Sequence, residues 1–505
     1  MKKIIFAMFL GLALCLHARA QSIDKVIEME EAEKHLKYLA SDEMMGRDTG
    51  SPEIEIAAEY IVSAFEKYGV KPLSDRDTFF QEVHLMQTNI PSKGELVFMD
   101  SIFTHGSNIL ILRGKDTVAT LNSIFVGYGT ESILDSLDLE GKLVVAKFGF
   151  KGMTNVRDGF KTSRSKRKMI SERGGLGLVE LYNSVQINWS LLSMYLNRPS
   201  MVLDDHSHSK INNPYHMFIN DPDGHYLSQA EEKGEFKLTL DVTGLTPNPL
   251  KGKNIIGYIE GTDQVLKDEF VILSAHYDHV GHSKAGMKNG EPIDSIFNGA
   301  RDNALGTTGM LMAAKYFGKV KPRRSILFIG FTAEEKGLLG SEYYAENPWV
   351  PLNQCIFNVN IDCAGYNDKT IATIFGMSRS SAENKFREAC AAFGLEAIDD
   401  PIPEQNIFER SDHFNFAKNG VPSVLFGPGV TAFDEEIQKY YHKVIDHAET
   451  IDFIYLNKVY KAYVKVSEDI ANADKAPFWV EGDKFESAGK QLYGMDKKNQ
   501  GQKHP

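Results

Sequence analysis

Side chains that bind metal ions or move protons recur where apolar runs of this sequence end. The runs "EFVILSAHYDH" and "RSILFIGFTAEE" close on such residues, and "GARDNALG", "NVNIDCAG" and "YYHKVID" carry others. The candidates are His276, Asp278, His279, Asp302, Glu334, Glu335, Asp362, His442 and Asp446. Imidazole and carboxylate suit zinc, with manganese or cobalt as substitutes. Two ions that share a carboxylate need about five protein ligands, and this set supplies them with a carboxylate left over as a base.

The elements that must position these residues alternate between strand and helix from Asn254 onward. "NIIGYIEG", "CIFNVNIDCAG" and "VPSVLFG" join the two runs above as short apolar strands, while "ALGTTGMLMAAKYFGK" and "RSSAENKFREACAAFG" have helical spacing. This alternation predicts an α/β domain with helices on both faces of a largely parallel sheet. Ligand sites in such sheets lie at the carboxyl ends of the strands, so the candidates can converge there.

Two regions with other sequence patterns precede this one. From about Ile27 to Tyr68 the apolar residues recur at three- and four-residue spacing, which predicts helices, and Gly69 ends the second helix. Between them lies the turn-rich stretch "SDEMMGRDTGS". From about Leu96 to Leu245 short β-like runs are punctuated by glycine, which predicts a separate, mostly β insert.

At this point the sequence resembles the di-zinc exopeptidases of the aminopeptidase S and aminopeptidase Y type. "AHYDH", "DN" with a following glycine, "EE", "ID" and "YH" occur in the family's order and spacing, and the insert is similar to a protease-associated domain. The resemblance implies a mixed, mostly parallel sheet flanked by helices. The expected organisation is a signal peptide (1–20), the N-terminal helical part of the catalytic domain (21–95), the insert (96–248), the catalytic domain (249–475) and a C-terminal tail (476–505).

The resemblance also implies a role for each residue of the site. His276 and Asp362 would hold one zinc ion, Glu335 and His442 a second, and Asp302 would bridge the two. The catalytic residues would be Glu334 as general base, Asp278 as the residue that orients His276, and Tyr441 as a donor to the developing oxyanion. The Asp302–Asn303 peptide bond would be cis, as in relatives.

Further residues are expected to bind substrate rather than metal. "RSDHFNF" matches a stretch that lines the family's substrate pocket, and Arg301 places a cation beside the bridging aspartate where relatives carry a small or acidic residue. The candidates are Arg301, Arg410, Ser411, Asp412 and His413. His279 and His282 are expected to belong to a loop after the first ligand.

Bulk properties restrict the setting. A length of 505 residues predicts two or three domains, and a net charge of −12 argues against a nucleic-acid or anionic-membrane binder. "MKK", an apolar run and "ARA" have the form of a signal peptide, so we expect an exported protein, periplasmic or secreted, without stable membrane insertion. Cys355, Cys363 and Cys390 cannot make a disulfide framework; one bridge or three buried thiols are both open.

The leading prediction is therefore a zinc aminopeptidase acting on peptides, of undetermined oligomeric state. A carboxypeptidase or dipeptidase of the same fold stays open, because Arg301 and Arg410 could bind a substrate carboxylate. Glutaminyl cyclisation is a second alternative, although those relatives typically use one zinc ion and lack the insert. A non-catalytic binding ectodomain is a third, but such proteins usually lose ligands and this set is intact.

Overall fold

The structure, a computed structural model, describes residues 23–184, 186–204, 214–283, 286–288 and 291–495. The expected signal peptide and the polar end of the expected tail, residues 496–505, lie outside these ranges. The chain divides into two compact units: unit 1 comprises the residues up to 83 and from 251 onward, and unit 2 comprises residues 84–250. Within the described ranges, no helix combines the length and the apolar character needed to cross a membrane.

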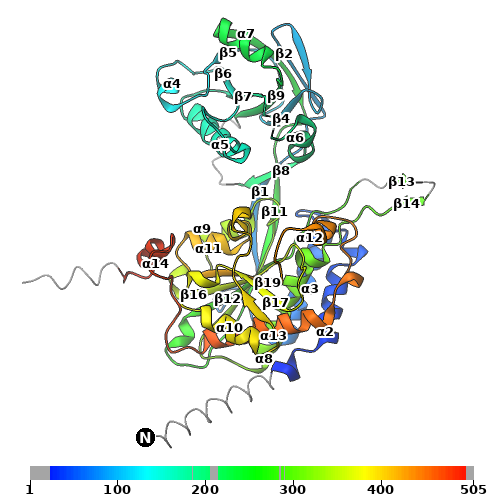
Figure 1. Cartoon of the computed structure of the whole chain (residues 1–505), viewed down its shortest axis with the longest axis vertical. Coiled ribbons are helices and arrows are strands. Elements are labelled where there is room, and N and C mark those ends of the chain that lie inside the picture. Colours follow the sequence, from blue (N-terminus) through cyan, green and yellow to red (C-terminus); the bar gives the residue numbers. More distant parts are fainter. Residues whose placement is uncertain (1–22, 185, 205–213, 284–285, 289–290, 496–505) are drawn as a thin grey trace, which may run out of the picture. The chain divides into compact units, whose positions relative to one another are not determined.

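Unit 1 is built around a mixed sheet (Figure 1). The strands lie in the order β18-β17-β19-β16-β12-β15-β11-β1. β12 is parallel to both β15 and β16, and β16 is parallel to β19. β11 and β17 run antiparallel to their neighbours β15 and β19. The bounds are β1 Phe80–Thr88, β11 Asn248–Ile259, β12 Phe270–His276, β15 Ser325–Phe331, β16 Cys355–Ile361, β17 Ile371–Phe375, β18 Glu396–Ile398 and β19 Ser423–Pro428. A separate hairpin pairs β13 (Gly286–Lys288) with β14 (Glu291–Ile293).

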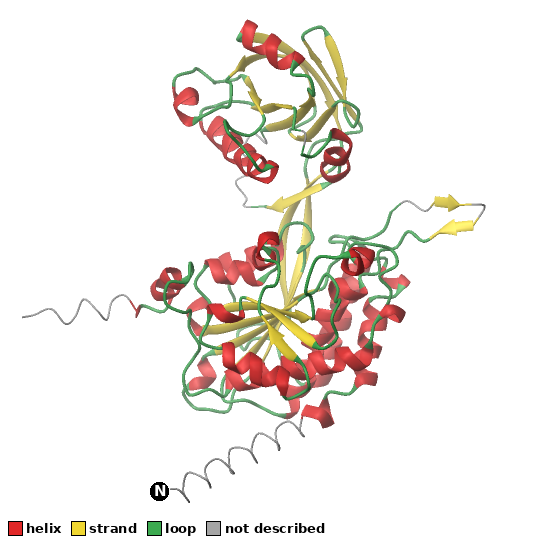
Figure 2. Ribbon diagram, in the orientation of Figure 1, coloured by secondary structure: helices red, strands yellow, loops and turns green. Residues whose placement is uncertain are grey.

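Helices cover both faces of this sheet (Figure 2). They are α2 Met29–Leu39, α3 Pro52–Tyr68, α8 Leu305–Lys319, α9 Leu339–Glu346, α10 Glu383–Ala391, α11 His413–Lys418, α12 Glu435–Tyr440, α13 Phe453–Ala471 and α14 Glu486–Leu492. Successive strand residues point to opposite faces. Leu273 of β12 packs in the cluster formed with α2, α3, α8, α10 and α13, whereas Ile272 packs with Tyr344 of α9 and Phe416 of α11. The α/β architecture predicted for this region is thus observed.

The helix end predicted at Gly69 is observed in α3, and the structure adds the start of that helix. α3 begins with Ser51, whose hydroxyl accepts the N–H of Ile54, and has Pro52 in its first turn, where the missing N–H costs nothing. It ends at Gly69, which has a φ of 82°. Glycine adopts this left-handed conformation without the penalty of a side chain.

The region expected to be a C-terminal tail is folded as far as the structure describes it. Trp479 is 4% exposed, and its indole N–H donates to the carbonyl of Gly420 at 2.9 Å. Phe485 packs with Trp479 and Phe408, just before α14. The apolar contacts of these aromatic residues hold residues 476–495 against the rest of unit 1.

Unit 2 carries its own mixed sheet, in the order β3-β2-β10-β5-β6-β7-β9-β4. The strands are β2 Lys93–Phe98, β3 Ser101–Thr104, β4 Ile109–Arg113, β5 Thr117–Phe125, β6 Leu143–Lys147, β7 Gly177–Tyr182, β9 Tyr215–Asn220 and β10 Glu235–Thr243. β8 (Ser200–Leu203) pairs separately with residues 85–88 of β1. The helices are α4 Glu131–Asp135, α5 Val156–Glu172, α6 Trp189–Leu196 and α7 His225–Lys233.

The described cysteines form no bridge. Cys355, Cys363 and Cys390 are free and buried. Of the two possibilities that the sequence left open, the structure has the three thiols.

Candidate metal centre

The candidate ligands meet because three parallel strands end side by side. In the pairing of β12 with β15, His276 lies opposite Phe331, so Glu334 and Glu335 follow a few residues beyond the same edge. In the pairing of β12 with β16, Ser274 lies opposite Asn360, which brings Asp362 level with His276. Asp302 comes from the segment that precedes α8, and His442 follows α12 closely.

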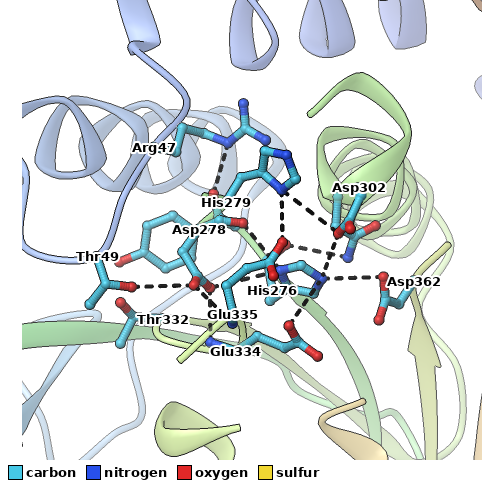
Figure 3. A network of polar contacts seen from close by, with 12 residues as sticks. Arg47, Thr49, His276, Asp278, His279, Asp302, Thr332, Glu334, Glu335 and Asp362 are labelled. Atoms are coloured by element: carbon cyan, nitrogen blue, oxygen red, sulfur yellow. Dashed lines mark hydrogen bonds and ion pairs between the residues drawn. The ribbon is translucent and has the colours of Figure 1, made fainter. Parts of the chain in front are cut away.

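One group of ligand atoms surrounds His276. Its Nε2 lies 3.2 Å from Oδ1 of Asp362, 3.5 Å from Oδ1 of Asp302 and 4.0 Å from Oε2 of Glu334. All these carboxyl groups converge on one imidazole nitrogen in Figure 3. The ring is held by its other nitrogen, which lies 3.2 Å from the carbonyl oxygen of Asp278.

A second group surrounds Glu335. Its Oε1 lies 3.2 Å from Nε2 of His442 and 2.8 Å from Nδ1 of His279. Oδ2 of Asp302 lies 3.1 Å from the same nitrogen of His442. Asp302 therefore offers one oxygen to each group, as a bridging carboxylate would.

The residues present fit divalent ions. In each group the ligand atoms of three or more side chains lie within 4.8 Å of one another: His276, Glu334 and Asp362 in the first, and His279, Asp302, Glu335 and His442 in the second. Nitrogen and carboxylate oxygen are the donors that zinc takes in proteins. Burying so many carboxylates together is costly unless cations compensate them.

Glu334 and Glu335 differ in electrostatics as well as in direction. Burial raises the pKa of the Glu334 carboxyl well above its ordinary value, with Asp362 and Glu335 adding to the effect. Burial also acts to raise the pKa of Glu335, but hydrogen bonds from His279 and His442 bring it well below the ordinary value. The pKa values of these two neighbouring glutamates thus shift in opposite directions, because His279 and His442 hydrogen-bond only to Glu335.

Asp278 supports this arrangement through its carboxylate. Oδ1 accepts the backbone N–H of Glu334 at 3.1 Å, and Oδ2 accepts that of Glu335 at 3.2 Å. The carboxylate itself is 3.8 Å from Nδ1 of His276, farther than the carbonyl oxygen of the same residue. Asp278 was predicted to orient His276; its backbone does so, while its side chain holds both glutamates.

His279 follows the end of β12, in the loop predicted for it. The sequence analysis assigned it no role at the metal centre, but its side chain is 1% exposed and contacts Glu335. Its position, three residues after His276 at the same strand end, was the available signal. His282, by contrast, is exposed, as expected of a loop residue.

A cavity of about 90 Å³ opens beside the ligands. Its polar end is formed by His276, Asp302, Glu334, Glu335 and Asp362, and Tyr441 and Arg410 also line it. The hydroxyl of Tyr441 lies 3.4 Å from Nη2 of Arg410, and its ring stacks on His442 at 4.1 Å between centroids. The remaining wall is largely apolar, with Phe375, Ile402, Ile407, Leu425, Val430, Phe433 and Ile437.

Three of the five expected substrate-binding residues do not face this cavity. The guanidinium of Arg301 bonds to Asp446 at 2.8 Å and to Thr450, and lies 3.6 Å from the ring centroid of Tyr440. Asp412 and His413 are fully buried. Arg301 is occupied by a neighbouring carboxylate and an aromatic face, and these contacts satisfy its charge without a substrate.

The side chains of Asp412 and His413 are enclosed by the protein and do not line the cavity. Burial raises the pKa of the Asp412 carboxyl to about 7 and lowers the pKa of the His413 imidazole to about 3. The His413 ring packs edge-on against Phe408 at 4.5 Å. Ser411 does line the cavity, where its hydroxyl donates to Oδ2 of Asp362 at 2.6 Å and so orients that carboxylate.

The backbone before α8 has the geometry that the resemblance implied. The Asp302–Asn303 peptide bond is cis. The Asn303 side-chain amide donates to the carbonyl of Ile361 at 3.1 Å, and its oxygen accepts the N–H of Gly306 at 2.9 Å.

With this geometry established, residues 254–467 match the model of peptidase family M28. These residues form a peptidase family M28 domain. The domain contains every candidate ligand from His276 to His442, and the predicted resemblance to metallo-exopeptidases of this family is confirmed.

Known proteins are similar to parts of this chain. Aminopeptidase YwaD of Bacillus subtilis (strain 168) is 28% identical over 309 residues, which are 59% of this chain and 61% of that protein. A probable zinc metalloprotease of Pyrenophora tritici-repentis (strain Pt-1C-BFP) is 30% identical over 148 residues, 28% of this chain and 32% of that protein. The chain thus spans less than two thirds of the length of these relatives.

Two solved structures share the fold. An aminopeptidase from Aneurinibacillus sp. strain AM-1 superposes with a TM-score of 0.61 and 20% identity, covering 90% of this chain and 97% of that one. BSAP, a zinc aminopeptidase from Bacillus subtilis, gives a TM-score of 0.50 at 20% identity, with 90% and 98% covered. These two structures support the mixed α/β fold of the chain, which includes the M28 domain.

Proposed function

We propose that this protein is a zinc-dependent aminopeptidase that binds two zinc ions and removes N-terminal residues from peptides. One observation carries the proposal: Asp302 offers an oxygen to each of two ligand groups, while Glu334 lies beside them with its own carboxylate. Two metal ions that share a carboxylate, with a neighbouring acid to accept a proton, can carry out hydrolysis. The family match and the zinc aminopeptidase of the same fold support the choice of metal and reaction.

The side chains have distinct tasks in such a reaction. Bound zinc ions supply Lewis acidity and make water acidic enough to ionise near neutral pH. His276 and Asp362 would hold one ion, Glu335 and His442 the other, and Asp302 both. Glu334 takes a proton from the attacking water and delivers it to the leaving amine.

Tyr441 and Arg410 are placed to act on the substrate. Both line the cavity and lie within 3.4 Å of each other, and the ring of Tyr441 is fixed by stacking on His442. A hydroxyl and a guanidinium in this position can donate hydrogen bonds to a carbonyl oxygen that gains negative charge. We assign them to the stabilisation of that oxygen.

The polarity of the substrate follows from the charges at the two ends of the cavity. The metal end holds the carboxylates of Glu334 and Asp362, which favour a protonated amine. The other end is largely apolar, so we infer a preference for peptides whose terminal side chain is apolar. Arg410 keeps carboxypeptidase action as a second candidate, because it is exposed and lines the cavity.

A panel of substrates tests both polarity and metal. Aminoacyl anilides, N-acetylated peptides and C-amidated peptides are offered to the zinc-loaded, chelator-stripped and zinc-restored protein. We expect cleavage of the anilides and of C-amidated peptides, loss of that cleavage with the chelator, and its return with zinc. Cleavage of N-acetylated but not of C-amidated peptides would establish the carboxypeptidase instead.

Export and the nature of unit 2 are part of the same proposal. The form of residues 1–20 supports removal of a signal peptide after Ala20, and the glycine-punctuated β runs of unit 2 support a protease-associated domain. Mass spectrometry of the N-terminus in cell fractions tests export: we expect a mature chain that begins at Gln21 in the periplasm or medium. A full-length chain retained in the cytoplasm would contradict it.

A further inference from the structure

The segment of residues 42–51, "DEMMGRDTGS", lies outside the M28 domain in sequence but against the metal centre in space. Gly46 accepts the N–H of Gly281 at 3.0 Å, and Arg47 accepts the N–H of His279 at 3.1 Å through its backbone carbonyl. Asp48 forms an ion pair of 2.5 Å with Lys336, the residue after Glu335. We call residues 42–51 the N-terminal loop.

Arg47 occupies the centre of these contacts. Its side chain is fully buried, and its guanidinium donates only to backbone carbonyls. Nε bonds to Tyr277 at 2.9 Å, Nη1 to Asn298 at 2.8 Å and to Leu39, and Nη2 to Gly299 at 3.1 Å. Four backbone carbonyls are thus paired with the N–H donors of one rigid guanidinium group.

Three of these four carbonyls belong to the two segments that carry metal ligands, and the fourth, that of Leu39, ends α2. Tyr277 stands between His276 and Asp278, and Gly299 lies three residues before Asp302. Figure 3 shows Arg47 on the His279 side of the cluster, with the acidic groups beyond it. One side chain therefore connects the end of β12 to the segment that presents the bridging carboxylate.

The N-terminal loop reaches the glutamates by a second route. The hydroxyl of Thr49 donates to Oδ2 of Asp278 at 3.2 Å, the same oxygen that accepts the N–H of Glu335. Asp278 in turn accepts the N–H of Glu334. The loop thus contacts the supports of both ligand groups.

The backbone of the N-terminal loop packs directly against the backbone of the segments that carry the ligands. Gly46 has a φ of 73°, and a Cβ atom there would lie 2.2 Å from the carbonyl oxygen of Gly281 and 2.6 Å from that of Phe297. Only glycine lets the backbone come this near. The positive φ of Arg47 itself, 48°, belongs to the same tight turn.

The charge of Arg47 also suits the centre. Burial lowers the pKa of its guanidinium to about 10, while the carboxylates of Asp278 and Asp302 act against this shift. The side chain is therefore cationic at neutral pH. A fixed cation here offsets part of the repulsion among the acidic ligands before metal binds.

We propose that Arg47 is a positioning residue of the metal centre, which holds the His276 segment and the Asp302 segment at the separation that two ions require. The inference rests on the proposed dinuclear zinc site and extends it to a residue outside the M28 domain. The Arg47 guanidinium bonds to backbone carbonyls and not to the candidate ligand side chains, so it acts through the backbone of the segments that it joins. Its loss should weaken metal binding more than it weakens the fold.

Zinc titration of three variants tests the inference. Arg47→Met removes all of these hydrogen bonds, and Arg47→Lys keeps the positive charge but not the planar set of N–H donors. Arg324→Met is the matched control. Arg324 is also buried, at 1% exposure, but it bonds to Glu269 and the carbonyl of Ala473, away from the ligands. The readouts are zinc stoichiometry and affinity in competition with a chromophoric chelator, and the Tm of the metal-free and zinc-loaded forms.

For Arg47→Met we expect zinc affinity to fall by about 10- to 100-fold, the range seen when residues that support metal ligands are removed. The rise in Tm on zinc binding should shrink with it. Arg47→Lys should show a smaller loss in the same direction. Arg324→Met should lower the Tm of both forms equally and leave zinc affinity unchanged.

The possible failures can be told apart. If the unaltered protein binds no zinc, the proposed function fails. If it binds two ions and Arg47→Met binds them within twofold of the same affinity, only the role of Arg47 is overturned. Should Arg47→Met not fold, Arg47→Lys decides the question by the same criterion.

Discussion

Nδ1 of His279 lies 2.8 Å from Oε1 of Glu335. The contact joins a residue just after β12 to one just after β15, and it is shielded from water because both side chains are almost fully buried. His279 thus either orients the carboxylate or shares its ion. Both roles make it part of the metal centre.

Replacing His279 by alanine should therefore weaken one of the two zinc sites. We expect the affinity for one equivalent to fall by about 10- to 100-fold, with the other nearly unchanged. Competition titration with a chelator measures the affinities for both zinc equivalents. His282→Ala is the matched control, since it removes an exposed imidazole from the same loop, and equal zinc binding by the two variants would exclude His279 from the centre.

The two adjacent glutamates should separate metal binding from turnover. Glu334→Gln is expected to keep both zinc ions but to lose about 10²- to 10⁴-fold in kcat, because an amide cannot accept the proton. Glu335→Ala should lose one zinc equivalent. Elemental analysis and steady-state rates on the same preparations provide the measurement. A Glu334→Gln protein with a normal rate is incompatible with its role as base.

Arg301 should matter for stability rather than for substrate binding. Breaking its buried pair with Asp446 leaves an uncompensated carboxylate, so Arg301→Met is expected to lower the free energy of unfolding by about 3–5 kcal/mol. KM of the folded variant should stay unchanged. Urea unfolding and steady-state kinetics test this, and a raised KM at unchanged stability would restore the original prediction of a substrate contact.

His35 gives the fold a pH dependence that is independent of the metal. Burial lowers the pKa of its imidazole to about 4, and its nitrogens lie 2.8 and 2.6 Å from the hydroxyls of Tyr60 and Tyr68. In the unfolded chain the pKa returns to about 6.5. Below that value the unfolded state binds the extra proton, so stability contributed by neutral His35 is lost as the pH falls from 6.5 to 4.

The expected loss is about 3 kcal/mol over this interval. The measurement is urea unfolding of the chelator-treated proteins at pH 7 and pH 4. Between these pH values the free energy of unfolding should fall more for the unaltered protein than for His35→Gln. The exposed His282→Gln serves as control and should follow the unaltered protein. If His35→Gln and the unaltered protein had identical pH profiles of stability, His35 would not be the source of this pH dependence.

Much of the catalytic unit could be read from local pattern. Apolar strands that end in His276, Glu335 and Asp362 predicted both the parallel sheet and the ligands, because the carboxyl ends of parallel strands share one edge. The end of α3 at Gly69 needed only the conformational freedom of glycine. These features depend on the type and order of residues near each other in the chain.

What the sequence by itself determined, then, was the set of strand-end ligands and the α/β order that gathers them. Only the tertiary structure decided which neighbours they have. Arg301 faces Asp446, His279 faces Glu335, and Arg47 reaches the carbonyl of Gly299 across 252 positions of the chain. Such contacts depend on where distant segments pack and on which buried charges need partners, and neither spacing nor residue type near a position carries that information.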